Sequence, residues 1–217
     1  MVKQRVIAYV DGFNLFYSSL KGTKFKWLDL VSLCKSMLNP DSQELVEVNY
    51  FSAYISSLGG DINRVNRQQL YIDALRSISN VNVHLGFFSI RRAKMPKADD
   101  FFDKGKINTV EVAKTEEKGT DVNLAVKLVA DAFRNRFDYA MLFSNDSDMS
   151  YAVHIATNDC MKKVGLYIDR KAVSFKALRK NICYTKRITP ALLASHQLPE
   201  EIKTSKDRII KRPREWI

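Results

Sequence analysis

The stretch RVIAYVDGFN, residues 5–14, decides the fold class of this chain. Its apolar part, residues 6–10, is short and continuous, which is typical of a parallel strand buried on both faces. Asp11 ends this run, and Gly12 and Asn14 follow as turn residues. A strand buried on both faces needs helices above and below its sheet, so this opening predicts an α/β protein.

The rest of the chain alternates between apolar runs and helical patterns. Further strands are expected at residues 45–55, 81–90, 137–143 and 162–168, and helices at 27–38, 61–79, 120–133 and 148–160. This alternation predicts a central, mostly parallel sheet of about five strands, with helices on both faces and right-handed crossovers. The first strand is not followed by a G-x-G-x-x-G loop, and the chain contains no P-loop, so the common nucleotide-binding motifs are absent.

Two segments depart from this alternation. Residues 91–119 are charged and contain Pro96 and Gly105, so we interpret them as an extended excursion, either a hairpin or a solvated loop. The end of the chain is polar and basic, and it is expected to be a disordered arm or a docking helix that Trp216 tethers. We therefore predict a folded domain at residues 1–170 and a basic C-terminal extension at residues 171–217.

The composition indicates a globular protein with a large core and an excess of positive charge. The 217 residues are 46% hydrophobic and carry a formal net charge of +11, which suits one domain of upper-middle size. No apolar run approaches the ~20 residues of a membrane span, and no signal peptide is visible, so we expect a cytoplasmic protein without membrane contact. The three cysteines are widely spaced, which argues against disulfides and a zinc site.

Four aspartates stand where a strand ends or a helix begins. Asp11 closes the first strand, Asp146 and Asp148 follow the strand at 137–143, and Asp121 opens the helix at 120–133. In open α/β sheets these positions share the edge where ligands bind. Two carboxylates ~4 Å apart repel each other by roughly 4 kcal/mol at an effective dielectric of about 20. Such a cluster needs a cation, a proton or wide separation, and oxygen ligands favour Mg²⁺ or Mn²⁺.

This pattern predicts metal-assisted hydrolysis of a phosphodiester. The four aspartates would hold the cation and activate water, and Asn14 would orient the water or a phosphate oxygen. Each acid taken alone is equally well explained as a helix cap or a turn residue. It is the convergence of four acids on one edge that favours a catalytic site.

Positive charge is concentrated late in the chain. Residues 162–187 hold nine Lys or Arg and one acid, Asp169. A basic surface beside an acidic pocket is typical of a protein that binds a polyanion such as nucleic acid, although a solvated basic face has the same composition. The candidate contacts to the substrate backbone are Lys118, Arg91, Arg92, Lys171, Lys176, Arg179 and Lys180.

Three motifs together resemble the NYN-domain proteins of the PIN-like nuclease superfamily, and among them the bacterial LabA-like type. The first is VDGFNL at residues 10–15, the second is EKGTDV at residues 117–122, and the third is SNDSDM at residues 144–149. Their order and spacing match the family over residues 5–168. No single motif would be specific, but the combination is.

The resemblance implies a Rossmann-like PIN fold and Mg²⁺- or Mn²⁺-dependent ribonuclease activity, with RNA favoured over DNA and endonucleolytic cleavage favoured over trimming. It carries metal-binding or catalytic roles onto Asp11, Asp121, Asp146, Asp148 and Asn14. Two positions depart from the family pattern, because Asn145 replaces the usual glycine and Met149 replaces an aromatic residue. Neither change removes an acid, so we expect an active site.

Two other functions remain open at this stage. One is an RNA-binding or regulatory module whose acidic site turns over little substrate. The other is a phosphatase or nucleotide hydrolase that uses the same acids on a small molecule, although a small phosphate needs no wide basic surface. A homo-oligomer is compatible with either.

Overall fold

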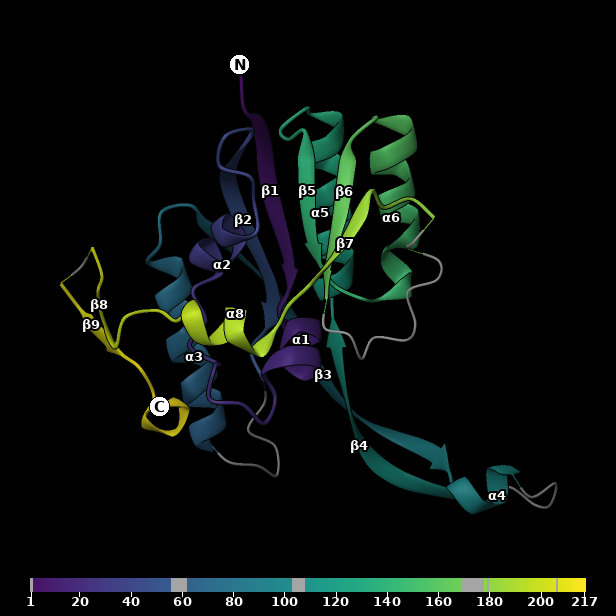
Figure 1. The fold of residues 1–217 in the computed structure, drawn as a ribbon. Coiled ribbons are helices and arrows are strands. Elements are labelled where there is room, and N and C mark those ends of the chain that lie inside the picture. The colour runs from purple at the N-terminus through teal and green to yellow at the C-terminus, as the bar shows by residue number, and fades with distance from the viewer. Residues whose placement is uncertain (1, 56–61, 103–107, 169–177, 179, 206) are drawn as a thin grey trace.

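The centre of the molecule is one mixed β-sheet (Figure 1). The computed structural model describes residues 2–55, 62–102, 108–168, 178, 180–205 and 207–217. Within these residues the sheet has seven strands, which are β1 (Gln4–Asp11), β2 (Gln43–Ala53), β3 (Val81–Pro96), β4 (Thr109–Lys118), β5 (Tyr139–Phe143), β6 (Lys163–Ile168) and β7 (Tyr184–Arg187). Their order is β4-β3-β2-β1-β5-β6-β7, and neighbouring strands are parallel except for β3 and β4.

The predicted α/β class and mostly parallel sheet are confirmed, but the predicted number of about five strands is wrong. The edge strands β4 and β7 account for the difference. β4 carries the charged residues Glu111, Lys114 and Glu116, and all four residues of β7 are exposed. Edge strands bury little surface, so they lack the continuous apolar runs by which buried parallel strands are found in a sequence.

Helices cover both faces of the sheet, as predicted. They are α1 (Gly12–Leu15), α2 (Leu30–Ser36), α3 (Ile62–Arg76), α4 (Ala98–Phe102), α5 (Thr120–Phe133), α6 (Ser150–His154) and α8 (Pro190–Ser195). Shorter turns are the π-helical η1 (Phe16–Leu20) and η3 (Ile155–Asp159) and the 3₁₀-helical η2 (Ser147–Met149) and η4 (Arg214–Trp216). Alternate residues of β1 serve the two faces, because Val6 packs in the core with α2 and α3 whereas Ile7 packs with α5 and α6.

Two helices differ from their predicted bounds. The helix expected at residues 27–38 begins only at Leu30, since the side chain of Asp29 accepts a hydrogen bond from the backbone N–H of Ser32 at 2.9 Å and caps the helix. Trp27 and Leu28 are buried in irregular chain before it. The helix expected at residues 148–160 is divided into η2, α6 and η3.

The charged segment after residue 90 is a hairpin, which was one of its two interpretations. β3 and β4 pair in antiparallel register from Phe87 opposite Lys118 to Pro96 opposite Thr109. The hairpin extends away from the rest of the sheet and carries α4 beyond its paired strands (Figure 1).

The C-terminal segment packs onto the core and is neither a free arm nor a docking helix. After α8, the short strands β8 (Glu201–Lys203) and β9 (Ile209–Lys211) form an antiparallel pair. The ring of Trp216 then lies 6.2 Å from the ring of Trp27 and 6.3 Å from that of Tyr71. Among the described residues, no helix has the length and apolar character needed to cross a membrane. The division of the chain at residue 170 stays a prediction.

Candidate active site

The carboxyl ends of the neighbouring strands β1 and β5 place two of the predicted acids together. Asp11 is the last residue of β1 and only 5% exposed. Its carboxylate accepts hydrogen bonds from the backbone N–H of Asn14 at 2.9 Å and from the hydroxyl of Ser144 at 3.1 Å. The same hydroxyl accepts a bond from the backbone N–H of Asp146 at 3.2 Å, so one serine side chain links the two acidic positions.

Gly12 is needed for the first acidic turn to sit where it does. A Cβ atom at this position would lie 2.5 Å from the ring of Tyr50 and 2.8 Å from the carbonyl oxygen of Phe51. Glycine therefore lets the turn after Asp11 approach β2 without a clash.

The second acidic turn is organised by its own aspartate. Asp146 accepts a hydrogen bond from the backbone N–H of Asp148 at 2.9 Å and caps η2. Asp148 is exposed and does not line the pocket described below. The structure therefore places Asp146 at the pocket and Asp148 at its outer side.

Asp121 reaches the same region from the first turn of α5. The turn before it requires Gly119, whose φ of 93° is in the left-handed region. The backbone N–H of Thr120 donates to the carboxylate of Glu117 at 3.1 Å, which satisfies one of the open N–H groups at the start of the helix. Gly86 makes room for this arrangement, since a Cβ there would lie 2.4 Å from the carbonyl oxygen of Lys118.

Burial and mutual repulsion disfavour ionisation of the two inner carboxylates. Burial, opposed by the hydrogen bonds from Asn14 and Ser144 and reinforced by the charges of Asp121 and Asp146, raises the pKa of Asp11 to about 6. Burial and then the charge of Asp146 also raise the pKa of Asp121 above its ordinary value. Within the described part of the chain, no Lys or Arg forms an ion pair with any of these three aspartates.

Asn14 joins the two acidic turns. Its side-chain amide donates to the side-chain oxygen of Asn145, and its own oxygen accepts a hydrogen bond from the backbone N–H of Asn145 at 3.3 Å. The asparagine that replaces the family glycine thus pairs with the asparagine of the first motif. Both polar ends of the Asn14 side chain are therefore engaged by the neighbouring loop.

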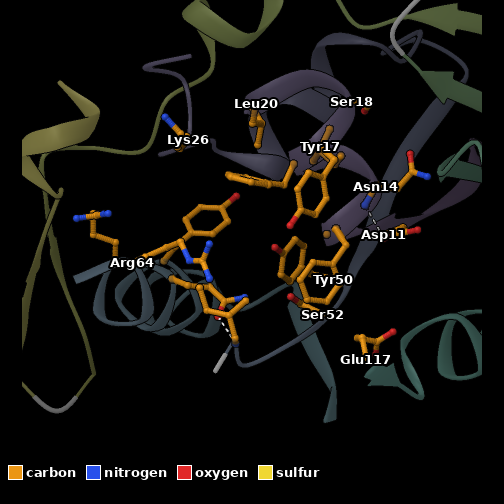
Figure 2. Close-up of a pocket in the computed structure, with 18 of the residues that line it drawn as sticks. Asp11, Asn14, Tyr17, Ser18, Leu20, Lys26, Tyr50, Ser52, Arg64 and Glu117 are labelled. Atoms are coloured by element: carbon orange, nitrogen blue, oxygen red, sulfur yellow. Dashed lines mark hydrogen bonds between the residues drawn. The ribbon is translucent and has the colours of Figure 1, made fainter. Parts of the chain in front are cut away.

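A pocket of about 1200 Å³ opens at this edge of the sheet. Its acidic side is lined by Asp11, Glu117, Asp121 and Asp146. Its walls also include residues of η1, β2, α3 and the C-terminal turn η4. Figure 2 shows Tyr17 and Tyr50 between Asp11 on one side and Lys26 and Arg64 on the other.

The donor set fits a hard divalent cation, although the side chains do not form a preassembled cage. Among the described residues, no group of three His, Cys, Asp or Glu is arranged to hold a metal ion. Mg²⁺ commonly uses one or two carboxylates and completes its shell with water and substrate phosphate oxygens. A buried carboxylate that resists ionisation, beside two further carboxylates without counter-ions, matches such a partial site.

Four of the predicted basic contacts, Arg91, Arg92, Lys118 and Lys180, are described by the structure, and none of them lines the pocket. Arg91 and Arg92 are on the hairpin, where they face Glu116 at 3.8 Å and Glu111 at 3.7 Å, respectively. Lys118 is half exposed, 3.7 Å from Glu116. Lys180 is exposed. The remaining predicted contacts, Lys171, Lys176 and Arg179, lie outside the described residues.

Several residues at or beside the pocket were not singled out from the sequence. Ser144 and Glu117 stand inside the quoted motifs, so their place beside the acids was a usable signal. The others come from segments with no motif at all, and only the fold brings them to the site. They are Tyr17, Lys26, Tyr50, Arg64, Arg67 and Trp216.

Comparison with known proteins identifies the family. The family model described as NYN domain matches residues 5–185, so the chain belongs to the NYN-domain family. The predicted resemblance is confirmed, and the LabA-like type stays a prediction.

Two individual proteins resemble the chain along most of its length. The 6-hydroxy-3-succinoylpyridine 3-monooxygenase HspA of Pseudomonas putida (strain DSM 28022 / S16) is 28% identical, with 98% of this chain and 75% of that protein covered. A protein of unknown function from Vibrio parahaemolyticus RIMD 2210633 has a crystal structure that matches with a TM-score of 0.57. That match has 18% identity, covers 90% of this chain and 97% of the other, and shows a shared fold.

Proposed function

We propose that this NYN-domain chain is a metal-dependent nuclease that hydrolyses phosphodiester bonds, with RNA as its substrate and internal cleavage as its mode. One observation carries the proposal. Asp11, Asp121 and Asp146 come from three different elements and line one side of a single pocket, where burial raises the pKa of the first two. A fold that gathers carboxylates without counter-ions gains from a cation there.

Asp11 and Asp146 are the residues that would hold Mg²⁺ or Mn²⁺, with Asp121 as a third ligand or as the group that orders the bound water. When bound, such an ion supplies a Lewis acid and an activated water for attack on phosphorus. The hydroxyl of Ser144 connects the two acidic turns, because it donates to the carboxylate of Asp11 and accepts from the backbone N–H of Asp146. Asn14 and Asn145 hold the two turns at a fixed separation.

The family supports a nucleic-acid substrate, because NYN domains belong to the PIN-like nucleases. The preference for RNA rests on this family relation and not on the charge of the chain. The excess of basic residues supports a polyanion over a small phosphate ester.

The test is a cleavage assay with single-stranded RNA, structured RNA and DNA in Mg²⁺, Mn²⁺ or EDTA. Wild type is compared with Asp146→Asn, and with Asp41→Asn as a control for an exposed aspartate outside the pocket. We expect metal-dependent cleavage that falls at least about a hundredfold in Asp146→Asn and is unchanged in Asp41→Asn. Retained RNA binding without cleavage by wild type would replace the nuclease with a binding module. Equal cleavage by wild type and Asp146→Asn would place the active site elsewhere.

A second candidate function is the conversion of a small aromatic acid. It is favoured by the aromatic and basic side of the pocket and by the name of the Pseudomonas relative, a monooxygenase of 6-hydroxy-3-succinoylpyridine. A monooxygenase consumes O₂ and a reductant by definition. Loss of 6-hydroxy-3-succinoylpyridine under air in the presence of NADH, measured by chromatography, therefore tests this function separately from the cleavage assay. An unchanged substrate would exclude it.

A further inference from the structure

The side of the pocket opposite the acids is basic. Lys26, Arg64 and Arg67 line it, and one acid, Glu215, lies among them. Glu215 pairs with Arg67 at 2.9 Å. In the described part of the chain, neither Lys26 nor Arg64 forms an ion pair, so this side keeps an excess of positive charge.

Two of these three cations, Lys26 and Arg67, repel each other. Burial, and then the charge of Arg67, lower the pKa of Lys26 below its ordinary value. Lys26 is half buried, and its ammonium donates to the carbonyl oxygen of Thr23, which fixes it at the pocket wall. An anion bound beside Lys26 would offset this repulsion, in the same way that a cation would offset the repulsion between the acids, and the exposed Arg64 adds a further positive charge on the same side of the pocket.

Aromatic rings separate the basic side from the acidic side. Figure 2 shows Tyr17 and Tyr50 between Lys26 and Arg64 on one side and Asp11 and Glu117 on the other. Tyr17 is 63% exposed; the ammonium of Lys21 lies over its ring, 5.1 Å from the centroid, so a planar ligand would contact the other face. Tyr50 is buried and packs edge-on against Tyr71, with the two ring centroids 6.1 Å apart. The ring of Tyr17 therefore lies between the two charged sides of the pocket.

We propose that this basic and aromatic side is a binding subsite for a planar ring that carries an oxyanion, with the ring against Tyr17 and the oxyanion beside Lys26 and Arg64. In the substrate of the proposed nuclease this ligand is a nucleotide, whose base stacks and whose phosphate is bound. That form of the subsite rests on the proposed function. The alternative source of the same chemistry is a small aromatic carboxylate.

The acidic and basic sides together set the orientation in which a nucleotide or a strand binds in the pocket. A free nucleotide binds by its phosphate to the basic side, because the acids repel it in the absence of a metal ion. A longer strand has further phosphates, so one of them can reach the acidic side while another is held by Lys26 and Arg64. The subsite thus orients the strand before cleavage and favours an unpaired nucleotide, since a base within a duplex presents no free face to Tyr17.

Binding of adenosine 5′-monophosphate in EDTA, measured by calorimetry, tests the subsite without metal and without turnover. We expect affinity to fall at least about tenfold in the double variant Lys26→Met/Arg64→Met, because two charge-assisted contacts are removed. The matched control is Arg76→Met, on the same helix α3 as Arg64 but outside the pocket. Equal affinity of wild type and the double variant for this nucleotide and for the aromatic acid used below would overturn the proposal.

A second variant separates the ring from the anion. Tyr17→Leu leaves the core intact, because the side chain is largely exposed, and it should weaken binding of adenosine 5′-monophosphate while leaving binding of inorganic phosphate unchanged. Unchanged binding of adenosine 5′-monophosphate by Tyr17→Leu would remove the ring contact from the proposal. Tighter binding of 6-hydroxypyridine-3-carboxylate than of the nucleotide, still dependent on Lys26 and Arg64, would keep the subsite and assign it to a small acid.

The binding measurement and the cleavage assay test the subsite and the nuclease separately, so either proposal can be rejected without the other. Asp146→Asn should bind adenosine 5′-monophosphate in EDTA at least as well as wild type, because it removes one repelling charge. Nucleotide binding without RNA cleavage by wild type would reject the nuclease and keep the subsite. RNA cleavage by wild type without nucleotide binding would reject the subsite and keep the nuclease.

Discussion

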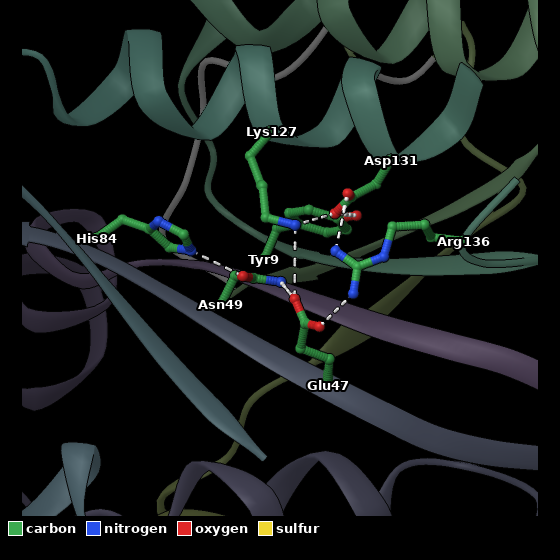
Figure 3. Close-up of polar contacts among 7 residues, drawn as sticks. All are labelled: Tyr9, Glu47, Asn49, His84, Lys127, Asp131 and Arg136. Carbon is green, nitrogen blue, oxygen red and sulfur yellow. Dashed lines mark hydrogen bonds and ion pairs between the residues drawn. The ribbon is translucent and has the colours of Figure 1, made fainter. Parts of the chain in front are cut away.

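Helix α5 carries two aspartates that the fold treats in opposite ways. Asp121 stands in the first turn, at the pocket, without a cation beside it. Asp131 lies near the other end of the helix and is fully buried, yet it is surrounded by donors. It accepts hydrogen bonds from the hydroxyl of Tyr9 at 2.9 Å, from Lys127 at 2.6 Å and from Arg136 at 3.2 Å (Figure 3).

Glu47 on β2 completes the second arrangement. It contacts Arg136 at 2.8 Å and Lys127 at 3.6 Å, so two acids meet two cations beneath the helix (Figure 3). Burial opposes ionisation of Glu47, but the hydrogen bond from Asn49 and the two positive charges outweigh it, and the pKa of Glu47 lies below its ordinary value.

The pKa of Asp11 moves in the opposite direction, to about 6, because its burial, reinforced by the charges of Asp121 and Asp146, outweighs its hydrogen bonds from Asn14 and Ser144. The presence or absence of a neighbouring cation therefore separates an acid that stabilises the fold from an acid that binds a ligand. Charges that hold the fold together are matched within it, whereas charges that await a ligand are left unmatched. Since an unmatched buried charge costs stability, its presence at a pocket indicates a use outside folding.

Removal of a matched charge should have the largest effect on stability. Asp131→Asn leaves Lys127 and Arg136 with one acid instead of two, and breaking a buried ion pair of this kind typically costs about 3–5 kcal/mol. Urea unfolding of wild type and variant at neutral pH measures the loss. Asp121→Asn, on the same helix, is the control and should cost little. Equal losses for the two variants would contradict the distinction between matched and unmatched acids.

Removal of an unmatched charge should raise stability. The pKa of Asp11 is about 6 in the fold against an ordinary value of 3.8, so its ionised form is disfavoured by folding. The protonated form of Asp11 contributes stability below about pH 4, and this stability is lost as the pH rises through about 6. The two pKa values differ by about 2 units, which corresponds to about 3 kcal/mol in the free energy of unfolding. Asp11→Asn should therefore be more stable than wild type above about pH 6 in EDTA.

Thermal unfolding across this pH range measures the effect. Addition of Mg²⁺ should stabilise wild type above about pH 6 and should stabilise Asp11→Asn less, because the cation replaces the missing partner. Parallel pH curves for the two proteins would mean that Asp11 has a partner in solution that the structure does not place beside it.

The sequence predicted the acidic side of the pocket well and the rest of it poorly. Asp11 and Asp146 were expected at one edge of the sheet, and the pairing of β1 with β5 brings the ends of their two strands side by side. Such positions are readable because a strand end and a helix start leave local signals in apolar runs and turn residues. The catalytic roles of these acids stay predictions.

The basic side left no local signal. Lys26 comes from a loop, Arg64 from α3 and Trp216 from the end of the chain, and each is an ordinary residue in its own segment. They meet only because the C-terminal turn packs back on the core beside Trp27. Long-range packing of this kind is invisible to periodicity, and the count of positive charges pointed instead to residues 162–187. The edge strands β4 and β7 were not counted in the central sheet for a related reason, since edge strands bury too little to show the apolar pattern of a buried strand.

A third kind of acid is paired with a cation but partly exposed, and its removal should have the smallest effect on stability. Asp138 is matched but partly exposed, with Arg5 at 2.9 Å and side chains 37% and 42% exposed, respectively. The hydrogen bond from Arg5 lowers the pKa of Asp138 to about 2, so its contribution is present above about pH 4 and is lost as the pH falls toward 2. Solvent screening limits this contribution to about 1 kcal/mol or less. Asp138→Asn should thus lower the urea midpoint slightly at neutral pH and less in high salt. A loss as large as that of Asp131→Asn would show that burial is not what separates the matched charges, and the argument from burial would have to be replaced by one from hydrogen bonding alone.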